Sequence, residues 1–138
     1  MFSDISAIRE ELKARIAPEL PDGWVVKEYL TEAIESLTPV VYFEFVRFDS
    51  KADGQPLGKG YAGAEFNIWI TDPKTDDKGS EDAVDTHVVR IINIIDSHSD
   101  IYWESAEKDR LKTGPLAWSI KAFAITNITP NTDPAPEE

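Results

Sequence analysis

The most constraining feature of this sequence is a pair of apolar-rich stretches, within residues 38–71, that flank a polar segment containing three glycines. The pattern predicts two long strands joined as a hairpin. Their connection, residues 49–60, is about twelve residues long, whereas ordinary hairpin loops have roughly two to five. A loop of this length is typically functional or mobile.

The first strand of this hairpin carries bulky apolar side chains in both alternation phases. One phase consists of Val41, Phe43, Phe45 and Arg47, and the other of Val40, Tyr42, Glu44, Val46 and Phe48. A sheet with one face in water has one polar phase. The strand therefore predicts a sheet whose second face is also covered, and raises the question of what covers it.

Two further stretches have the apolar period of an amphipathic helix. The first follows the capping residue Asp4 and ends at Pro18, and its apolar stripe consists of Ile5, Ile8, Leu12 and Ile16. The second follows the capping residue Ser80 and runs to about His98. Its stripe consists of Val84, Val88, Ile91 and Ile95, widened by Ile92 and Ile94. Each stripe predicts a helix that packs on a sheet.

The remaining strands are predicted at residues 24–30, 101–105 and 115–128, with a charged turn at 106–114. Residues 31–37 fit either a short helix or an irregular connection. The element order is therefore α-β-β-β-α-β-β. It predicts an α+β fold, a mainly antiparallel sheet of about five strands with two helices packed on one face.

The chain length of 138 residues and its composition, 41% apolar and 29% charged, predict one globular domain. We assign that domain to residues 1–128. Residues 129–138 are acidic and rich in proline, and we expect this tail to be disordered.

Acidic side chains outnumber basic ones by 26 to 14, a net charge of −12. This balance argues against a protein that binds nucleic acid by neutralising phosphates. It fits a surface that repels nucleic acid, a surface that binds a basic partner, or a charge that serves solubility. The sequence has no cysteine, and thus no disulfide or thiolate metal site. It shows neither a signal-peptide pattern nor a membrane span, so we expect no membrane contact.

No motif in the sequence predicts catalysis, a metal site or a cofactor. His87 and His98 are eleven positions apart, about 16 Å along a helix, too far to bind one ion. The stretch GQPLGKG at residues 54–60 lacks the spacing of a phosphate loop and its final Ser or Thr. We therefore expect a protein that is not an enzyme, although a pair of carboxylates brought together by the fold is an alternative.

Acidic residues gather around the loop before the second helix. They are Asp72, Asp76, Asp77, Glu81 and Asp82. Their spacing does not match the calcium-binding loop of an EF-hand. We interpret them as a solvated acidic rim in preference to a cation site.

Two helices cover only one face of such a sheet, so the apolar side chains of the other face predict a contact with another copy of the chain. Candidate interface residues are Tyr42, Val46, Phe48, Tyr61 and Trp69, together with Phe123, depending on strand register. The long loop is the candidate assembly loop, through Lys51, Asp53, Gln55, Leu57 and Lys59. A head-to-tail contact of this kind would close into a ring.

The element order, the opening ISAIREELKARIAPELPDGWVV, the long-looped hairpin and the helix after an acidic loop resemble the tail-terminator proteins of long-tailed bacteriophages. The resemblance covers residues 1–128. A short helix followed by an L-P-x-G-W-x-V strand is common among small tail proteins of phages that infect actinobacteria. Tail-completion and head–tail connector proteins have a similar size and a related topology, and are the nearest alternatives.

The resemblance implies a structural role. Such proteins form a hexameric ring that caps the tail tube, stops its polymerisation and joins the tail to the head-completion proteins. The implied partners are further copies of the chain, the major tail tube protein, and the head-completion or connector proteins. DNA would pass through the bore of the ring without specific binding, and the acidic rim suits such a bore.

The implied location is the head-proximal end of the tail in the virion, after synthesis in the cytoplasm of the host bacterium. Two other classes remain as alternatives: a small α+β enzyme that uses carboxylates, and an acidic inhibitor that mimics nucleic acid.

Overall fold

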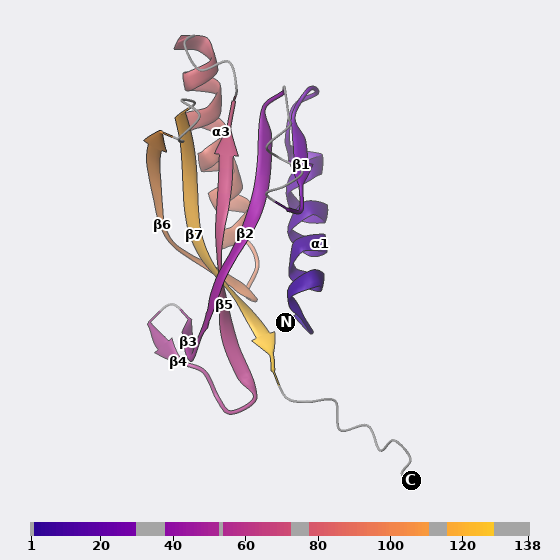
Figure 1. Cartoon of the computed structure of the whole chain (residues 1–138), viewed down its shortest axis with the longest axis vertical. Helices are drawn as coiled ribbons and strands as arrows, with labels where there is room; N and C mark the ends of the chain where they lie inside the picture. The colour runs from indigo at the N-terminus through magenta and orange to yellow at the C-terminus, as the bar shows by residue number, and fades with distance from the viewer. Residues whose placement is uncertain (1, 30–37, 53, 73–77, 111–115, 129–138) are drawn as a thin grey trace.

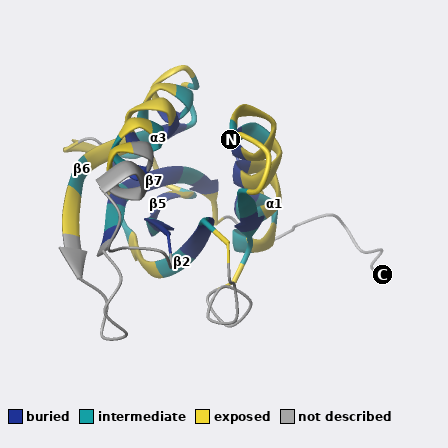
Figure 2. Cartoon of the chain, turned by 90° about the horizontal axis from the view of Figure 1, so that it is seen from above, coloured by how far each residue is buried: buried dark blue, intermediate teal, exposed yellow. Residues whose placement is uncertain are grey.

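Two helices lie on the same side of a five-stranded sheet (Figures 1 and 2). The computed structural model describes residues 2–29, 38–52, 54–72, 78–110 and 116–128. The helices are α1 (Ile5–Ile16) and α3 (Lys78–Asp96), and a short 3-10 turn, Ala17–Glu19, follows α1. The predicted segments 31–37 and 129–138 lie outside the described residues.

The sheet has the strand order β1-β2-β5-β7-β6. Its strands are β1 (Val25–Lys27), β2 (Val40–Asp49), β5 (Tyr61–Thr71), β6 (Ile101–Arg110) and β7 (Leu116–Asn127). Strands β1 and β2 are parallel, and the other neighbours are antiparallel. The strands β3 (Lys51–Ala52) and β4 (Gln55–Pro56) form a separate small hairpin. The predicted α+β architecture, with both helices on one face, is confirmed.

Helix α1 begins and ends where its sequence predicts. The carboxylate of Asp4 accepts a 2.7 Å hydrogen bond from the backbone N–H of Ala7, which satisfies one of the free donors of the first turn. The helix passes into the 3-10 turn that contains Pro18. Its buried side chains are Ile8, Leu12 and Ile16, three members of the predicted stripe.

Helix α3 begins at Lys78, so Ser80 lies inside its first turn and is not the residue that precedes the helix. The prediction of Ser80 as the capping residue is therefore wrong. The predicted stripe is confirmed: Val84, Val88, Ile91 and Ile95 are buried, and Ile92 and Ile94 pack against the core from its margin.

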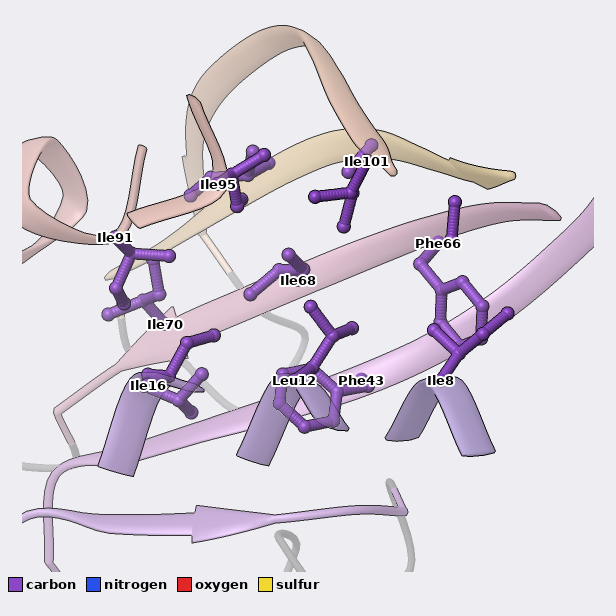
Figure 3. Close-up of a cluster of buried hydrophobic side chains, with 14 of the residues drawn as sticks. Ile8, Leu12, Ile16, Phe43, Phe66, Ile68, Ile70, Ile91, Ile95 and Ile101 are labelled. Carbon is purple, nitrogen blue, oxygen red and sulfur yellow. The ribbon is translucent and has the colours of Figure 1, made fainter. Parts of the chain in front are cut away.

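The main core fills the space between the helices and the sheet (Figure 3). Ile8 and Leu12 of α1 point toward Phe43 and Phe66 of the sheet, and Ile91 and Ile95 of α3 enter the same cluster. Replacing a fully buried isoleucine such as Ile91 by alanine typically costs about 2–5 kcal/mol. The core thus fixes which face of each strand is turned toward the helices.

Two strand predictions need correction. Strand β1 is shorter than residues 24–30, since it pairs with β2 only from Val25 to Lys27. Strand β6 is longer than 101–105, because residues 106–110, predicted as a charged turn, pair with β7 as far as Arg110. Strand β6 is an edge strand, where charged side chains are common, and backbone pairing outweighs the low strand propensity of Glu and Lys.

Candidate assembly surfaces

The face of the sheet turned away from the helices, the open face, is not uniformly apolar. Register places on it Tyr42 and Glu44 of β2, Gly63, Glu65, Asn67 and Trp69 of β5, and Ser119, Lys121 and Phe123 of β7. The opposite face, called the helix face, carries the main core. The expectation of a largely apolar second face is therefore corrected: apolar groups occupy its two ends, and polar groups lie between them.

The first apolar end of the open face is a small cluster around Tyr42 and Trp69. Their rings are stacked, with centroids 6.2 Å apart and planes 13° apart. Val40 and Tyr42 are buried, and Val25 and Trp69 pack against them. Burial raises the pKa of the Tyr42 phenol to about 12, and the nearby carboxylate of Glu44 adds to this shift. Two predicted interface residues, Tyr42 and Trp69, thus contact each other within one chain.

Glu44 organises the polar middle of the open face. Its Oε1 accepts a 2.9 Å hydrogen bond from the indole N–H of Trp69 and a 3.1 Å bond from the amide of Asn67. On β7, Lys121 forms an ion pair of 3.4 Å with Glu104 of β6. These contacts turn Glu44 and Lys121 toward neighbouring strands, which explains how polar groups are accommodated between two apolar ends.

The hairpin β3–β4 covers the second apolar end of the open face. Ala52 of β3 is buried, and so is Phe123 of β7. A Cβ atom placed on Gly63 would lie 2.5 Å from the carbonyl oxygen of Lys51 and 3.4 Å from the ring of Phe123. The backbone of β3 therefore rests directly on β5, where only glycine leaves room for it.

This position changes the interpretation of the predicted assembly loop. Within it, Lys51, Gln55 and Lys59 are exposed, Leu57 is half-buried, and Asp53 lies outside the described residues. The loop is closed by the backbone bond from Leu57 N–H to the carbonyl of Ser50, 2.9 Å. In Figure 1 the hairpin lies beside the lower ends of β2 and β5. One face of the loop thus covers its own sheet, and the other presents charged and polar side chains.

A β-bulge in β2 separates the predicted interface residues. Phe45 pairs with Phe66 and Arg47 with Glu65, so Val46 is an extra residue. After it, Phe48 pairs with Ala64, a core residue, and its ring contacts that of Phe45 at 5.1 Å. Phe48 therefore lies on the helix face, whereas Trp69 lies on the open face. The expectation that Tyr42, Val46 and Phe48 share one face is wrong.

The bulge instead turns Arg47 toward the open face. Arg47 Nε forms an ion pair with Oε1 of the buried Glu65, at 2.8 Å but without hydrogen-bond geometry. Arg47 Nη1 donates a 2.9 Å hydrogen bond to the carboxylate of Asp49. A hydrogen bond from the backbone N–H of Lys51 lowers the pKa of the Asp49 carboxyl, and the hydrogen bond from the Arg47 side chain lowers it further. More than half of the Arg47 side chain is exposed.

Three exposed apolar side chains of the sheet lie at its edges. Val46 and Phe48 are exposed on β2, beyond the three residues that pair with β1, and Trp103 is exposed on β6 at the opposite edge. Tyr61 is exposed at the start of β5. The sequence did not single out Arg47, Trp103 or Glu104, because edge position follows from strand order, which the sequence pattern leaves open.

The predicted acidic rim is only partly described. Asp72 is buried directly after β5, Glu81 lies in the first turn of α3, and Asp82 is exposed on that helix. Asp76 and Asp77 lie outside the described residues. Among the residues that are described, no three His, Asp or Glu side chains gather as a metal site would require.

His87 is half-buried on α3, where it packs against Trp24. Its ring meets Trp24 edge to face, with centroids 4.9 Å apart, and its Nδ1 is buried without a hydrogen-bond partner in the described structure. Burial lowers the pKa of His87, and the nearby Arg90 lowers it further. The contact ties the end of the loop before β1 to α3.

A scan against protein-family models finds no match to this chain, and a search of curated protein sequences finds none. No helix in the described segments is long and apolar enough to span a lipid bilayer.

Proposed function

We propose that this chain is a tail-terminator protein of a long-tailed bacteriophage. In this role it assembles into a hexameric ring that caps the tail tube, stops the tube from growing and joins the tail to the head-completion proteins. The α-β-β-β-α-β-β order and the long β2–β5 hairpin support the proposal, because the resemblance to tail terminators depends on them.

The main observation in favour of a ring is that exposed apolar side chains lie at two opposite edges of one sheet, Phe48 on β2 and Trp103 on β6. Aromatic side chains are enriched at protein–protein interfaces relative to the rest of the protein surface. Two different patches on one chain favour a head-to-tail contact, which closes into a ring when the rotation between neighbours divides a full turn.

The charge of the chain suits such a ring. Each subunit carries a net charge of −12, so a hexamer presents a strongly negative surface to DNA. A negative bore lets a duplex pass without binding it, because no counterions are released. Of the predicted rim, Asp82 is an exposed candidate for the bore, whereas Asp72 is buried.

The proposal is tested by adding the purified chain to polymerising tail tube protein and imaging the tubes by electron microscopy. We expect tubes that stop growing and carry a ring-shaped cap at one end. Unchanged tube lengths and bare ends would contradict the proposal. Binding to purified heads but not to tubes would instead favour the connector alternative.

A control variant for this experiment is Val89→Asp. Val89 is 59% exposed on α3 and belongs to neither edge strand. The change adds the same charge to an exposed apolar position that is not one of the residues of the proposed contact. We expect this variant to cap tubes as the unmodified chain does.

A further inference from the structure

The register of the sheet relates positions on its two edges through rows of Cα partners that cross the sheet. Cα partners join Phe45, Phe66, Ala122 and Trp103 in one row. The row two positions further along joins Phe48, Ala64, Ala124 and Ile101. The exposed aromatic groups of the two edges, Phe48 and Trp103, therefore lie within two rows of each other along the strands.

The same two groups also lie on the same face. Phe48 pairs with Ala64, and Trp103 is linked by register to Ala122; both alanines belong to the core under the helices. Phe48 is 49% exposed and Trp103 is 36% exposed. The helix face thus carries one exposed aromatic side chain at each edge, at similar heights.

The open face carries a matching pair of opposite charges. Arg47 lies on the β2 edge, and Glu104 is the extra residue of a second irregularity, in β6 directly after Trp103. Each side chain is more than half exposed, although each is also paired within its own chain, Arg47 with Asp49 and Glu65, and Glu104 with Lys121. The β2 edge therefore presents an aromatic group and a cation, and the β6 edge presents an aromatic group and an anion, in the same arrangement.

We infer that the β2 edge of one subunit contacts the β6 edge of the next, with Phe48 against Trp103 and Arg47 against Glu104. This inference rests on the proposed function and names the contact that closes its ring. The occupant of each edge is a second copy of the chain, because the two edges complement each other in apolar surface and in charge.

Symmetry supports the pairing. Neighbours in a closed ring are related by rotation alone, so groups that meet lie at equal heights along the axis. When the strands run roughly along that axis, Phe48 and Trp103 of adjacent subunits are offset by two rows, about 7 Å, a distance that two aromatic side chains span. The irregularities at Val46 and Glu104 interrupt each edge. Bulges oppose continuous pairing of edge strands, so side chains carry this contact.

The first test uses two variants that each damage one edge, Phe48→Asp and Trp103→Asp, with Val89→Asp as the control. Each edge variant alone should remain monomeric, a loss of about 30-fold or more in association, as for an aromatic hot spot. An equimolar mixture of the two retains one intact pair of edges, and should form one-to-one dimers and nothing larger in sedimentation velocity. The control should form rings.

The second test exchanges the charges, which leaves the apolar packing in place. Arg47→Glu and Glu104→Arg should each prevent ring formation when alone. Mixed together, the two variants can alternate around a ring with every contact complementary, and rings should return. Circular dichroism verifies that each variant is folded before mixing.

The outcomes separate this inference from the proposed function. Rings formed by Phe48→Asp or Trp103→Asp alone, or folded mixtures that stay monomeric while the unmodified chain forms rings, would overturn the edge contact and leave the ring intact. A chain that stays monomeric even beside tail tubes would overturn both.

Discussion

The backbone carbonyl of Lys51 occupies the space next to Gly63, so that a Cβ atom at Gly63 would lie only 2.5 Å from it. Strand β3 of the small hairpin therefore lies directly on β5 of the main sheet. This contact buries Ala52 and Phe123, and it answers the question raised by the two-faced strand pattern: part of the second face is covered by the chain's own loop.

Gly63→Ala should displace the hairpin from the sheet. The added methyl group meets backbone and not a flexible side chain, so we expect a loss of about 1–3 kcal/mol in the free energy of unfolding. Hydrogen exchange should show lower protection in β3 and β4. Gly58→Ala is the control, because its Cβ would meet only the ring of Tyr61, at 3.9 Å. Equal stability and protection in both variants would show that the hairpin does not rest on Gly63.

Asp100 should make the fold sensitive to acid. Arg15 donates two 3.0 Å hydrogen bonds to the carboxylate of Asp100, which joins α1 to the segment before β6 and holds the pKa of Asp100 below its usual value of 3.8. A lowered pKa in the folded state contributes stability above the unfolded pKa, and this contribution is lost as pH falls through the folded pKa.

Asp100→Asn should therefore destabilise the chain by about 2 kcal/mol at neutral pH, and the difference from the unmodified chain should shrink below about pH 4. Urea unfolding at several pH values measures both quantities. The control is Asp96→Asn at the exposed end of α3, for which we expect a change within about 0.5 kcal/mol. A difference for Asp100→Asn that is independent of pH would contradict the linkage.

Tyr42 should make the fold sensitive to alkali. Its pKa is raised from 10.0 to about 12, so the phenol is neutral in both states at pH 7. As pH rises from 10 toward about 12 the unfolded chain ionises first, and the folded state loses stability. Tyr42→Phe removes the ionisable phenol, so the unfolding free energy of this variant should fall less steeply over that pH range. Parallel curves for the two proteins would contradict the assignment.

Glu44 should stabilise the open face mainly as a hydrogen-bond acceptor. Glu44→Ala leaves the indole N–H of Trp69 and the amide of Asn67 without their acceptor, at a cost of about 1–3 kcal/mol. Glu44→Gln retains an acceptor oxygen and should lose less than half as much. Thermal unfolding compares the two. Equal losses would mean that the charge of Glu44, and not its acceptor oxygen, stabilises this face.

The sequence predicted the parts of the fold that local periodicity controls. The stripe of Ile8, Leu12 and Ile16 gave α1 and its buried face, and the apolar pattern of residues 38–71 gave the hairpin of β2 and β5. It did not predict the full length of β6, because the charged residues 106–110 become strand only through pairing with β7.

The candidate interface was less predictable, because one extra residue in β2 determines which face each later side chain of that strand lies on. Val46 is the extra residue of a bulge, and this single insertion moves Phe48 to the helix face while Tyr42 and Trp69 stay on the open face. A register shift of one residue reverses every later side chain, and the pattern of alternation alone does not reveal it. The edge positions of Trp103 and Glu104 depend likewise on strand order.

The mass of the assembled protein tests the central claim most directly. Mass photometry or light scattering of the purified chain, alone and with tail tubes, reports whether it closes into a ring. The account predicts one discrete species of about six chains of 15.5 kDa, with no continuing series of larger sizes. A monomer at every concentration and beside tubes, or an open-ended series of oligomers, would contradict it.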